Sequence, residues 1–235
     1  MATMKEINGA AISRQNISYY DEIAAEYDAI LNKDTKNAVV RKQVADRFMV
    51  AVKKGLVLDF GGGTGQDIDW LSWHYKIIFC EPSAAMRKYA AGRNAAKGII
   101  FLDDSATDFR EWSASFPFEQ AVDAVLANFA VINCIPDIKL FFEKLAMVVK
   151  PGGTVMALIL DNSLPKRLRS DTKATVQSFF SGSPVSISVN YNGNSQQVYI
   201  HSSKAIESAT VKYFELKLFE PLQGSGFCLI HLIRK

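Results

Sequence analysis

A glycine-rich segment follows the first strongly apolar run of the chain. Residues 56–60 predict a buried strand that carries one acid, Asp59, and Gly61, Gly62, Gly63, Thr64 and Gly65 come directly after it. Glycines let a ligand approach the backbone closely, and a helix that begins beyond them offers free amide groups. The segment therefore favours a small-molecule binding loop over a plain turn between a strand and a helix.

Two common nucleotide-binding patterns are absent from this segment. A dinucleotide fingerprint that started at Gly61 would need a glycine six positions along, where the chain has Gln66. A phosphate loop would end in Gly-Lys-Ser or Gly-Lys-Thr, which does not occur here. The short Gly-x-Gly-x-Gly form after Asp59 indicates a different ligand.

Strand-like and helical segments alternate around this loop and must position it. Apolar strand patterns cover 56–60, 76–80, 99–102, 122–127 and 154–160, and helical patterns lie between them at 66–73, 84–96 and 137–149. This alternation predicts a doubly wound α/β fold with a seven-stranded, mostly parallel sheet. Two further strand patterns, 213–219 and 227–233, are joined by 224–226. Because so short a link joins only antiparallel neighbours, the last strand is expected to run against the others.

Composition excludes several classes of protein. The 235 residues carry a net charge of +3 and are 49% hydrophobic, as expected for one large globular domain. No apolar run has the length of a membrane span and no signal-peptide core is present, so we expect a cytoplasmic protein with no membrane contact. Three scattered cysteines and three histidines predict no metal site. The small charge excess makes a nucleic-acid partner unlikely.

At this point the motifs resemble those of a known family. Segment 57–65 is similar to the first motif of class I (Rossmann-like) S-adenosylmethionine-dependent methyltransferases, and segment 19–28 resembles the N-terminal helix of the members that act on small molecules. Glu81, after the second strand, matches the acid that binds both ribose hydroxyls in that family. Asp104-Ser105 resembles the pair that meets the adenine, and Lys150-Pro151-Gly152-Gly153 resembles the turn before the fifth strand. The resemblance implies S-adenosylmethionine as cofactor and S-adenosylhomocysteine as product.

The resemblance also implies which residues form the cofactor site. Met86 would pack on the adenine, Asn128 would lie near the methionine moiety, and tyrosines of an N-terminal helix over 17–31 would cover the cofactor. Asp103 stands where the family more often has glycine, so either Asp103 or Asp104 could meet the adenine, and we favour Asp104. Simple packing roles for Met86 and the tyrosines remain open. The implied site consists of Asp59, Gly61, Gly62, Gly63, Gly65, Glu81, Pro82, Met86, Asp104, Ser105, Asn128, Tyr20 and Tyr27.

The implied reaction is methyl transfer to an oxygen, nitrogen or carbon nucleophile of a small organic acceptor. Such a reaction depends mainly on alignment and exclusion of water, and it needs a base only if the acceptor must lose a proton. His201 is the only residue we consider as a weak catalytic candidate. Residues 127–130 lack the Asp/Asn-Pro-Pro-Tyr/Phe motif of amino-group nucleic-acid methyltransferases. An RNA or protein methyltransferase and a non-catalytic cofactor-binding protein of the same fold remain alternatives.

The chain is expected to form a single methyltransferase domain, with four parts in sequence order. Residues 1–54 would be a helical cap, 55–160 the cofactor-binding core, 161–203 an insert or lid, and 204–235 the C-terminal strands. The insert contains a hairpin signal at 192–194 and a short helical pattern near 172–180. We expect this insert and the N-terminal helix to cover the acceptor.

Overall fold

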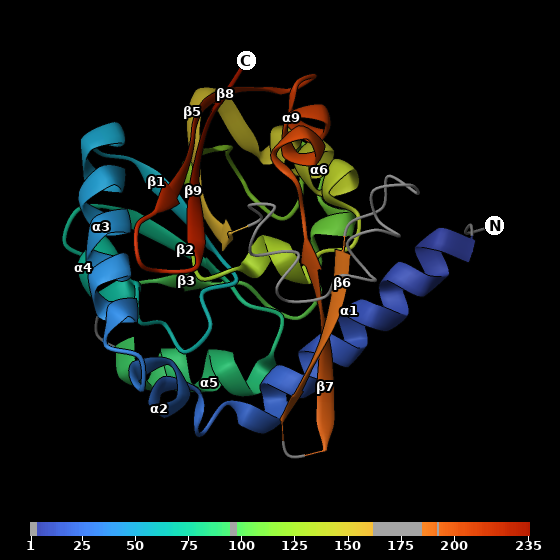
Figure 1. Cartoon of the computed structure of the whole chain (residues 1–235). Coiled ribbons are helices and arrows are strands. Elements are labelled where there is room, and N and C mark those ends of the chain that lie inside the picture. Colours follow the sequence, from blue (N-terminus) through green and yellow to red (C-terminus); the bar gives the residue numbers. More distant parts are fainter. Residues whose placement is uncertain (1–3, 95–97, 162–184, 192) are drawn as a thin grey trace.

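A seven-stranded sheet occupies the centre of the computed structural model, which describes residues 4–94, 98–161, 185–191 and 193–235 (Figure 1). The strand order is β3-β2-β1-β4-β5-β9-β8, and β9 runs antiparallel to both of its neighbours while the other strands are parallel to one another. The strands are β1 (Leu56–Phe60), β2 (Lys76–Cys80), β3 (Ile100–Phe101), β4 (Val122–Ala127), β5 (Val149–Leu160), β8 (Phe214–Leu222) and β9 (Phe227–Arg234). The predicted fold class and the antiparallel last strand are confirmed.

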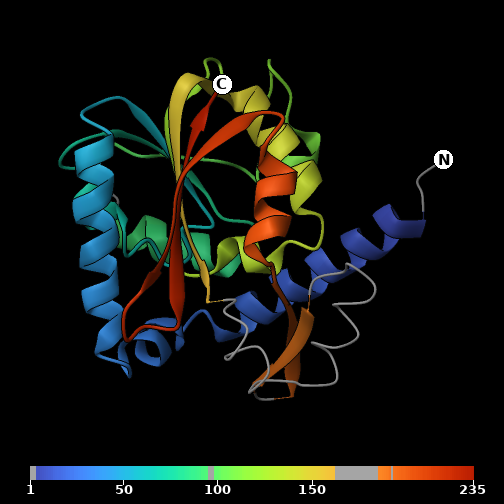
Figure 2. The same cartoon turned by 45° about the horizontal axis from the view of Figure 1, so that its top comes forward.

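Helices cover both faces of this sheet and bury its apolar side chains (Figure 2). On one face, Val44 and Phe48 of α3 pack with apolar residues of α4 and the strands. On the other face, Phe141 of α6 and Ile206 of α9 contribute to a separate cluster. The central strands are apolar on both sides because each side meets a helix. The helices are α3 (Lys36–Ala51), α4 (Ile68–Leu71), α5 (Ala84–Asn94), α6 (Ile138–Val148) and α9 (Ser203–Thr210).

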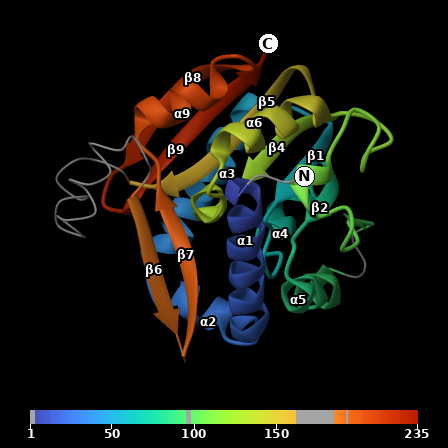
Figure 3. The same cartoon turned by 90° about the vertical axis from the view of Figure 1, so that its right-hand side faces the viewer.

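The N-terminal helices lie at the carboxyl ends of the parallel strands. Helix α1 (Met4–Ile23) passes between α5 and a separate two-stranded hairpin (Figure 3). Helix α2 (Tyr27–Asn32) then leads to α3. The prediction of a single helix over 17–31 is wrong, because a turn at 24–26 separates α1 from α2. This turn lets the two tyrosine-bearing helices approach the sheet from different directions.

The insert after β5 contains the hairpin, formed by β6 (Val185–Tyr191) and β7 (Asn194–Ile200). Residues 162–184 and 192 lie outside the described residues, and so do the predicted helix near 172–180 and part of the predicted turn. Helix α9 begins after Ser202, whose hydroxyl accepts a hydrogen bond from the Ala205 amide. Over the described ranges, no helix has the length and apolarity needed to cross a membrane.

Candidate functional site

A cavity of about 620 Å³ opens at the carboxyl ends of β1, β2 and β4, under α1 and α2. This edge of a parallel sheet is the usual place for a ligand in an open α/β fold. The structure brings most of the predicted residues to its wall: Asp59, Gly61, Gly62, Gly63, Glu81, Pro82, Met86, Asp104, Asn128, Tyr20 and Tyr27. Gly65, Ser105 and His201 are not among the lining residues.

The glycine loop has a backbone that other residues could not easily adopt. Gly61 and Gly63 have φ values of +69° and +58°, which L-residues rarely reach. A side chain at Gly62 would overlap the Phe79 ring and lie 2.8 Å from Asp59 Oδ2. Gly65 also has a positive φ, and its amide donates to the Gly62 carbonyl at 2.9 Å. Gly65 therefore closes the turn, while the three glycines before it form the wall of the cavity.

Glu81 is held rigidly at the end of β2. Its Oε2 accepts from the Gly63 amide at 3.0 Å, and its Oε1 accepts from the Ser83 amide at 2.8 Å. Each carboxylate oxygen keeps a further lone pair for a ligand. Burial raises the pKa of Glu81 to about 7, although the two amides oppose this rise. The side chain is thus an oriented acceptor with unused capacity, 7% exposed at the cavity wall.

Asp59 is a second buried carboxyl group, at the end of β1. Its Oδ2 has no hydrogen-bond partner within the described part of the chain, and the residue is only 1% exposed. Burial raises the pKa of Asp59 well above its usual value, and the nearby Asp67 charge adds to this effect. An unpartnered buried acceptor is costly unless a donor or a cation meets it. This part of the cavity therefore suits a positively charged or hydrogen-bond-donating group.

A buried polar network beside Asp59 contains residues that the sequence analysis missed. Arg41 of α3 forms an ion pair with Asp67 at 2.5 Å, and the Asn128 amide donates to the same carboxylate at 3.0 Å. The Arg41 guanidinium also lies 4.5 Å from the centre of the Phe129 ring. In the sequence, the only available signal for this network was that polar residues stand among the apolar positions of the segments that form α3 and α4. The network fixes Asn128 at the end of β4.

The roof of the cavity comes from α1 and α2. The Tyr20 hydroxyl lies 3.6 Å from Cys134 Sγ, and the Tyr20 and Tyr27 rings meet edge to face with centroids 6.0 Å apart. Tyr27 also stands over the glycine loop, since a Cβ built on Gly63 would lie 3.5 Å from its ring. Burial raises the pKa of Tyr20, so its hydroxyl stays protonated at neutral pH. The roof is aromatic, and the Tyr20 hydroxyl in it can donate or accept a hydrogen bond.

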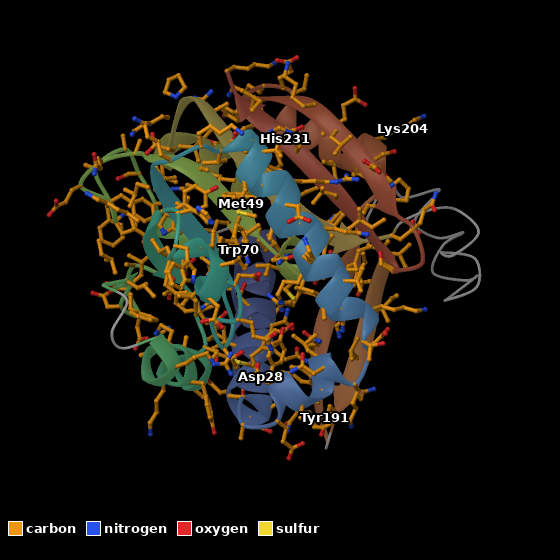
Figure 4. The ribbon with its side chains drawn as sticks, turned by 90° about the vertical axis from the view of Figure 1, so that its left-hand side faces the viewer. Asp28, Met49, Trp70, Tyr191, Lys204 and His231 are labelled. Atoms are coloured by element: carbon orange, nitrogen blue, oxygen red, sulfur yellow. The ribbon has the colours of Figure 1, made fainter. Side chains whose placement is uncertain are left out.

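Asp28, which Figure 4 labels, joins α2 to the glycine loop, a contact that the sequence analysis missed. Its Oδ1 accepts from Thr64 Oγ1 at 2.5 Å and from Gln66 Nε2 at 2.6 Å, and its Oδ2 accepts from Arg93. Burial alone would raise the pKa of Asp28, but these hydrogen bonds outweigh it and lower the pKa. The helix that carries Tyr27 is thereby fastened to the loop that it covers.

The structure separates the two aspartates after β3. Asp104 lines the cavity and pairs with Arg87 of α5. Asp103 accepts from the Ser105 hydroxyl at 2.7 Å and from the Ala106 amide at 3.0 Å, so it closes a local turn. Ser105 is used in that turn and does not reach the cavity wall. The geometry favours Asp104 over Asp103 as the residue that faces a ligand.

His201 does not occupy a catalytic position. It is 1% exposed, does not line the cavity, and hydrogen-bonds to the backbone of Ile132 and Ile135. Burial lowers the pKa of His201 to about 4, so the ring is neutral at pH 7. His231, on β9, lies at the opposite end of the molecule from Asp28 (Figure 4). Both histidines belong to the packed body of the protein. Within the described ranges, no group of three or more His, Cys, Asp or Glu residues could hold a metal ion.

Comparisons with known proteins agree with this geometry. Residues 57–153 match a family model described as a methyltransferase domain. The chain carries a Rossmann-like methyltransferase domain. This result confirms the expected resemblance, and the matched range covers β1 to the start of β5, where most of the cavity residues lie. No curated protein matches the sequence of the chain.

Solved structures share the fold of this methyltransferase domain. One is a DhpI-SAM-HEP complex, with 21% identity, full coverage of both chains and a TM-score of 0.71. Another is the glycopeptide N-methyltransferase MtfA complexed with S-adenosyl-L-homocysteine (13% identity, covering 81% of this chain and 88% of that one, TM-score 0.58). A third is CalS10 from Micromonospora echinaspora, an amino pentose methyltransferase of calicheamicin biosynthesis (16% identity, 83% and 90% coverage, TM-score 0.56).

Proposed function

We propose that the cavity binds S-adenosylmethionine and that the protein transfers its methyl group to a small organic acceptor. The observation that carries this proposal is the Glu81 carboxylate, which two amides orient at the cavity wall while each oxygen retains a free lone pair. Two vicinal ribose hydroxyls are donors that such a carboxylate can accept. The cavity volume of about 620 Å³ suits a nucleoside-sized ligand together with a small second molecule.

The other cavity residues fit the remaining parts of this cofactor. Asp59 offers an unpartnered carboxylate oxygen to the ammonium group of the methionine moiety, and Asn128 lies at the same end. The Met86 side chain is fully buried beside Tyr20 and Tyr27 and offers an apolar surface to the adenine. Gly61, Gly62 and Gly63 line the same space and let a ligand approach the backbone closely. When bound, the cofactor supplies a methyl group on a cationic sulfonium.

The protein's own contribution is orientation and exclusion of water. Glu81 and Asp59 hold two fixed points of one reactant, and the aromatic roof covers the reacting end. Such alignment accounts for a large part of the rate in reactions between two bound molecules. Among the polar groups of the roof, we assign the Tyr20 hydroxyl to orienting the acceptor's nucleophilic atom.

The acceptor is proposed to be small and largely apolar. Beyond the cofactor residues, the cavity wall includes Ile17 of α1, Val131 and Ile135, with Arg14 at the exposed side. Two structures of the same fold are named for an amino pentose and a glycopeptide substrate, which supports a small-molecule acceptor. Of the three arginines that line the cavity, Arg41 pairs with Asp67 and Arg110 pairs with Asp108, so we propose Arg14 as the residue that would meet an acidic group on the acceptor.

Two measurements test the proposed function. Isothermal titration calorimetry with S-adenosylhomocysteine should show one site per chain, and no binding would refute the cofactor. Transfer of radiolabelled methyl groups from S-adenosylmethionine should then be measured on a panel of neutral and anionic small molecules, bulk RNA and protein. Transfer to RNA or protein alone would refute the small-molecule acceptor. Binding without any transfer would favour a non-catalytic protein.

A further inference from the structure

The β6–β7 hairpin lies against α1 and not against the cavity. It forms a two-stranded sheet of its own, and none of its described residues lines the cavity wall. It nevertheless contacts α1 along β7, as Figure 3 shows. The expectation that the insert itself covers the ligand is therefore not met by its described part. Any effect of the hairpin on the site must act through α1.

Asn16 makes the central contact between the two elements. Its Nδ2 donates to the Gln197 carbonyl at 3.0 Å, and its Oδ1 accepts from the Gln197 amide at 2.8 Å. The side chain thus pairs with β7 as the backbone of a neighbouring strand would. Nδ2 also donates to the Cys134 carbonyl at 3.3 Å, which is in the segment after β4. One side chain, only 4% exposed, therefore joins α1, the hairpin and the cavity wall.

Further polar contacts tie the hairpin on both sides. Tyr191 donates to Glu26 Oε2 at 2.5 Å, just beyond the end of α1. On the other side, Asn133 donates to the Tyr199 carbonyl at 2.7 Å and accepts from the Leu160 amide at 3.0 Å. Asn133 is fully buried. The hairpin is thus attached both to the end of α1, which forms part of the cavity roof, and to the segment that follows β4.

The position of Asn16 on α1 gives this attachment a consequence for the site. Asn16 itself lies at the cavity wall, as do the adjacent Ile17 and Tyr20, which follows one turn later on the same helix. Because these residues form part of the cavity wall, a movement of α1 away from the sheet widens the exit for a ligand bound beneath them. If α1 moved while the hairpin stayed in place, the hydrogen bonds between Asn16 and Gln197 would break, so these bonds oppose such a movement.

We propose that Asn16 is a positioning residue that makes α1 and the β6–β7 hairpin one cap, which moves as a unit when the cofactor product leaves. This inference rests on the proposed function, because it assumes that S-adenosylhomocysteine occupies the cavity. The hairpin then sets the release rate of the product without touching it. Glu81 and Asp59, in contrast, contact the product directly and contribute to its binding affinity.

The Asn16→Asp variant tests this proposal with S-adenosylhomocysteine as the probe. The substitution keeps the shape but replaces two donors with an anionic oxygen that faces two carbonyls, so it breaks the attachment. We expect the dissociation rate measured by surface plasmon resonance to rise at least tenfold, with the association rate within threefold of the wild type. Asn190→Asp is the matched control, because Asn190 is exposed on the same hairpin, and it should change neither rate more than twofold. Equal dissociation rates for Asn16→Asp and the wild type would overturn the proposal.

Hydrogen exchange of the ligand-free protein separates this inference from the proposed function. In Asn16→Asp, amides of residues 12–20 and 194–200 should exchange faster together, whereas Asn190→Asp should leave both unchanged. Faster exchange in the hairpin alone would refute the single cap even if the wild type binds no S-adenosylhomocysteine. If Asn16→Asp does not fold, Asn16→Ser removes the same donors without adding a charge, and the same criteria apply.

Discussion

The Glu81→Gln variant gives the strongest test of how the cavity recognises its ligand. In the wild type, one carboxylate oxygen accepts from the Gly63 amide and the other from the Ser83 amide. A glutamine can place its carbonyl oxygen against only one of them, so its NH₂ group must face the other backbone N–H. The variant therefore loses one ribose acceptor, weakens the second, and sets two donors against each other.

The size of the effect follows from these lost contacts. Hydrogen bonds to charged groups contribute about 1.5–3 kcal/mol each, so we expect S-adenosylhomocysteine binding to weaken by about 2–4 kcal/mol. This corresponds to an increase in Kd of roughly 30- to 1,000-fold, measurable by calorimetry. An analogue without the ribose hydroxyls should lose much less affinity on the same substitution. Glu220→Gln is the matched control, since Glu220 pairs with Arg47 on the surface of β8.

The pH dependence of binding gives a second check on Glu81. Its pKa is about 7 in the ligand-free protein, and only the ionised form can accept from both hydroxyls. Affinity in the wild type should therefore fall as the pH drops below about 7, approaching tenfold per pH unit. The part of this dependence that centres near pH 7 should disappear in Glu81→Gln. A variant that bound the ligand as tightly as the wild type, with the same pH profile, would show that another residue holds the ribose.

Three further substitutions test the architecture around the cavity. Gly62→Ala should lower the free energy of unfolding by about 1–3 kcal/mol in chemical denaturation, because the new methyl group overlaps Phe79; unchanged stability would contradict the loop geometry. Asp28→Asn should lower stability by about 1 kcal/mol at pH 7, since the Arg93 pair is partly exposed. The pKa of Asp28 is lower in the folded protein than in the unfolded chain, so the ionised Asp28 stabilises the folded state fully only above the unfolded pKa. The stability difference between wild type and Asp28→Asn should therefore disappear as the pH falls through the folded pKa, and a constant difference down to pH 2 would refute this. His201→Asn should lower stability by about 1–3 kcal/mol and leave S-adenosylhomocysteine affinity within twofold, whereas loss of affinity without loss of stability would restore a role for it in the site.

The sequence predicted the sheet well because the relevant signals are local. Strands β1, β2 and β4 are short, mostly apolar runs that end directly before Gly61, Glu81 and Asn128, and their bounds were predicted to the residue. The antiparallel β9 followed from the short link at 224–226, since chain connectivity permits no other direction. Helix α4 was predicted over 66–73 but covers only Ile68–Leu71, because the glycine loop extends further into that segment than its composition suggests.

Most of the cavity residues were predicted through the family resemblance, and several of its motifs lie at strand ends. The carboxyl ends of adjacent parallel strands meet in space, so Asp59, Glu81 and Asn128 converge without any need to know the loops. Two residues whose contacts depend on how helices pack, Arg41 and Asp28, were not predicted. Arg41 reaches Asp67 only because α3 packs against α4 with that face inward, and the sequence does not show which polar residues of the two segments pair.

The net charge of the whole chain differs in sign from the charge of two of the acids at the cavity wall. The chain as a whole carries +3, yet the cavity wall combines the acids Asp59 and Glu81, neither of which has an ion-pair partner among the described residues. Burial makes each of these carboxyl groups expensive to ionise, so the cavity is best stabilised by a ligand that brings positive charge and hydrogen-bond donors. A sulfonium cofactor with an ammonium group and two ribose hydroxyls supplies both. Net charge therefore says little about this site, whereas the position of each acid at a strand end determines which ligand the protein can hold.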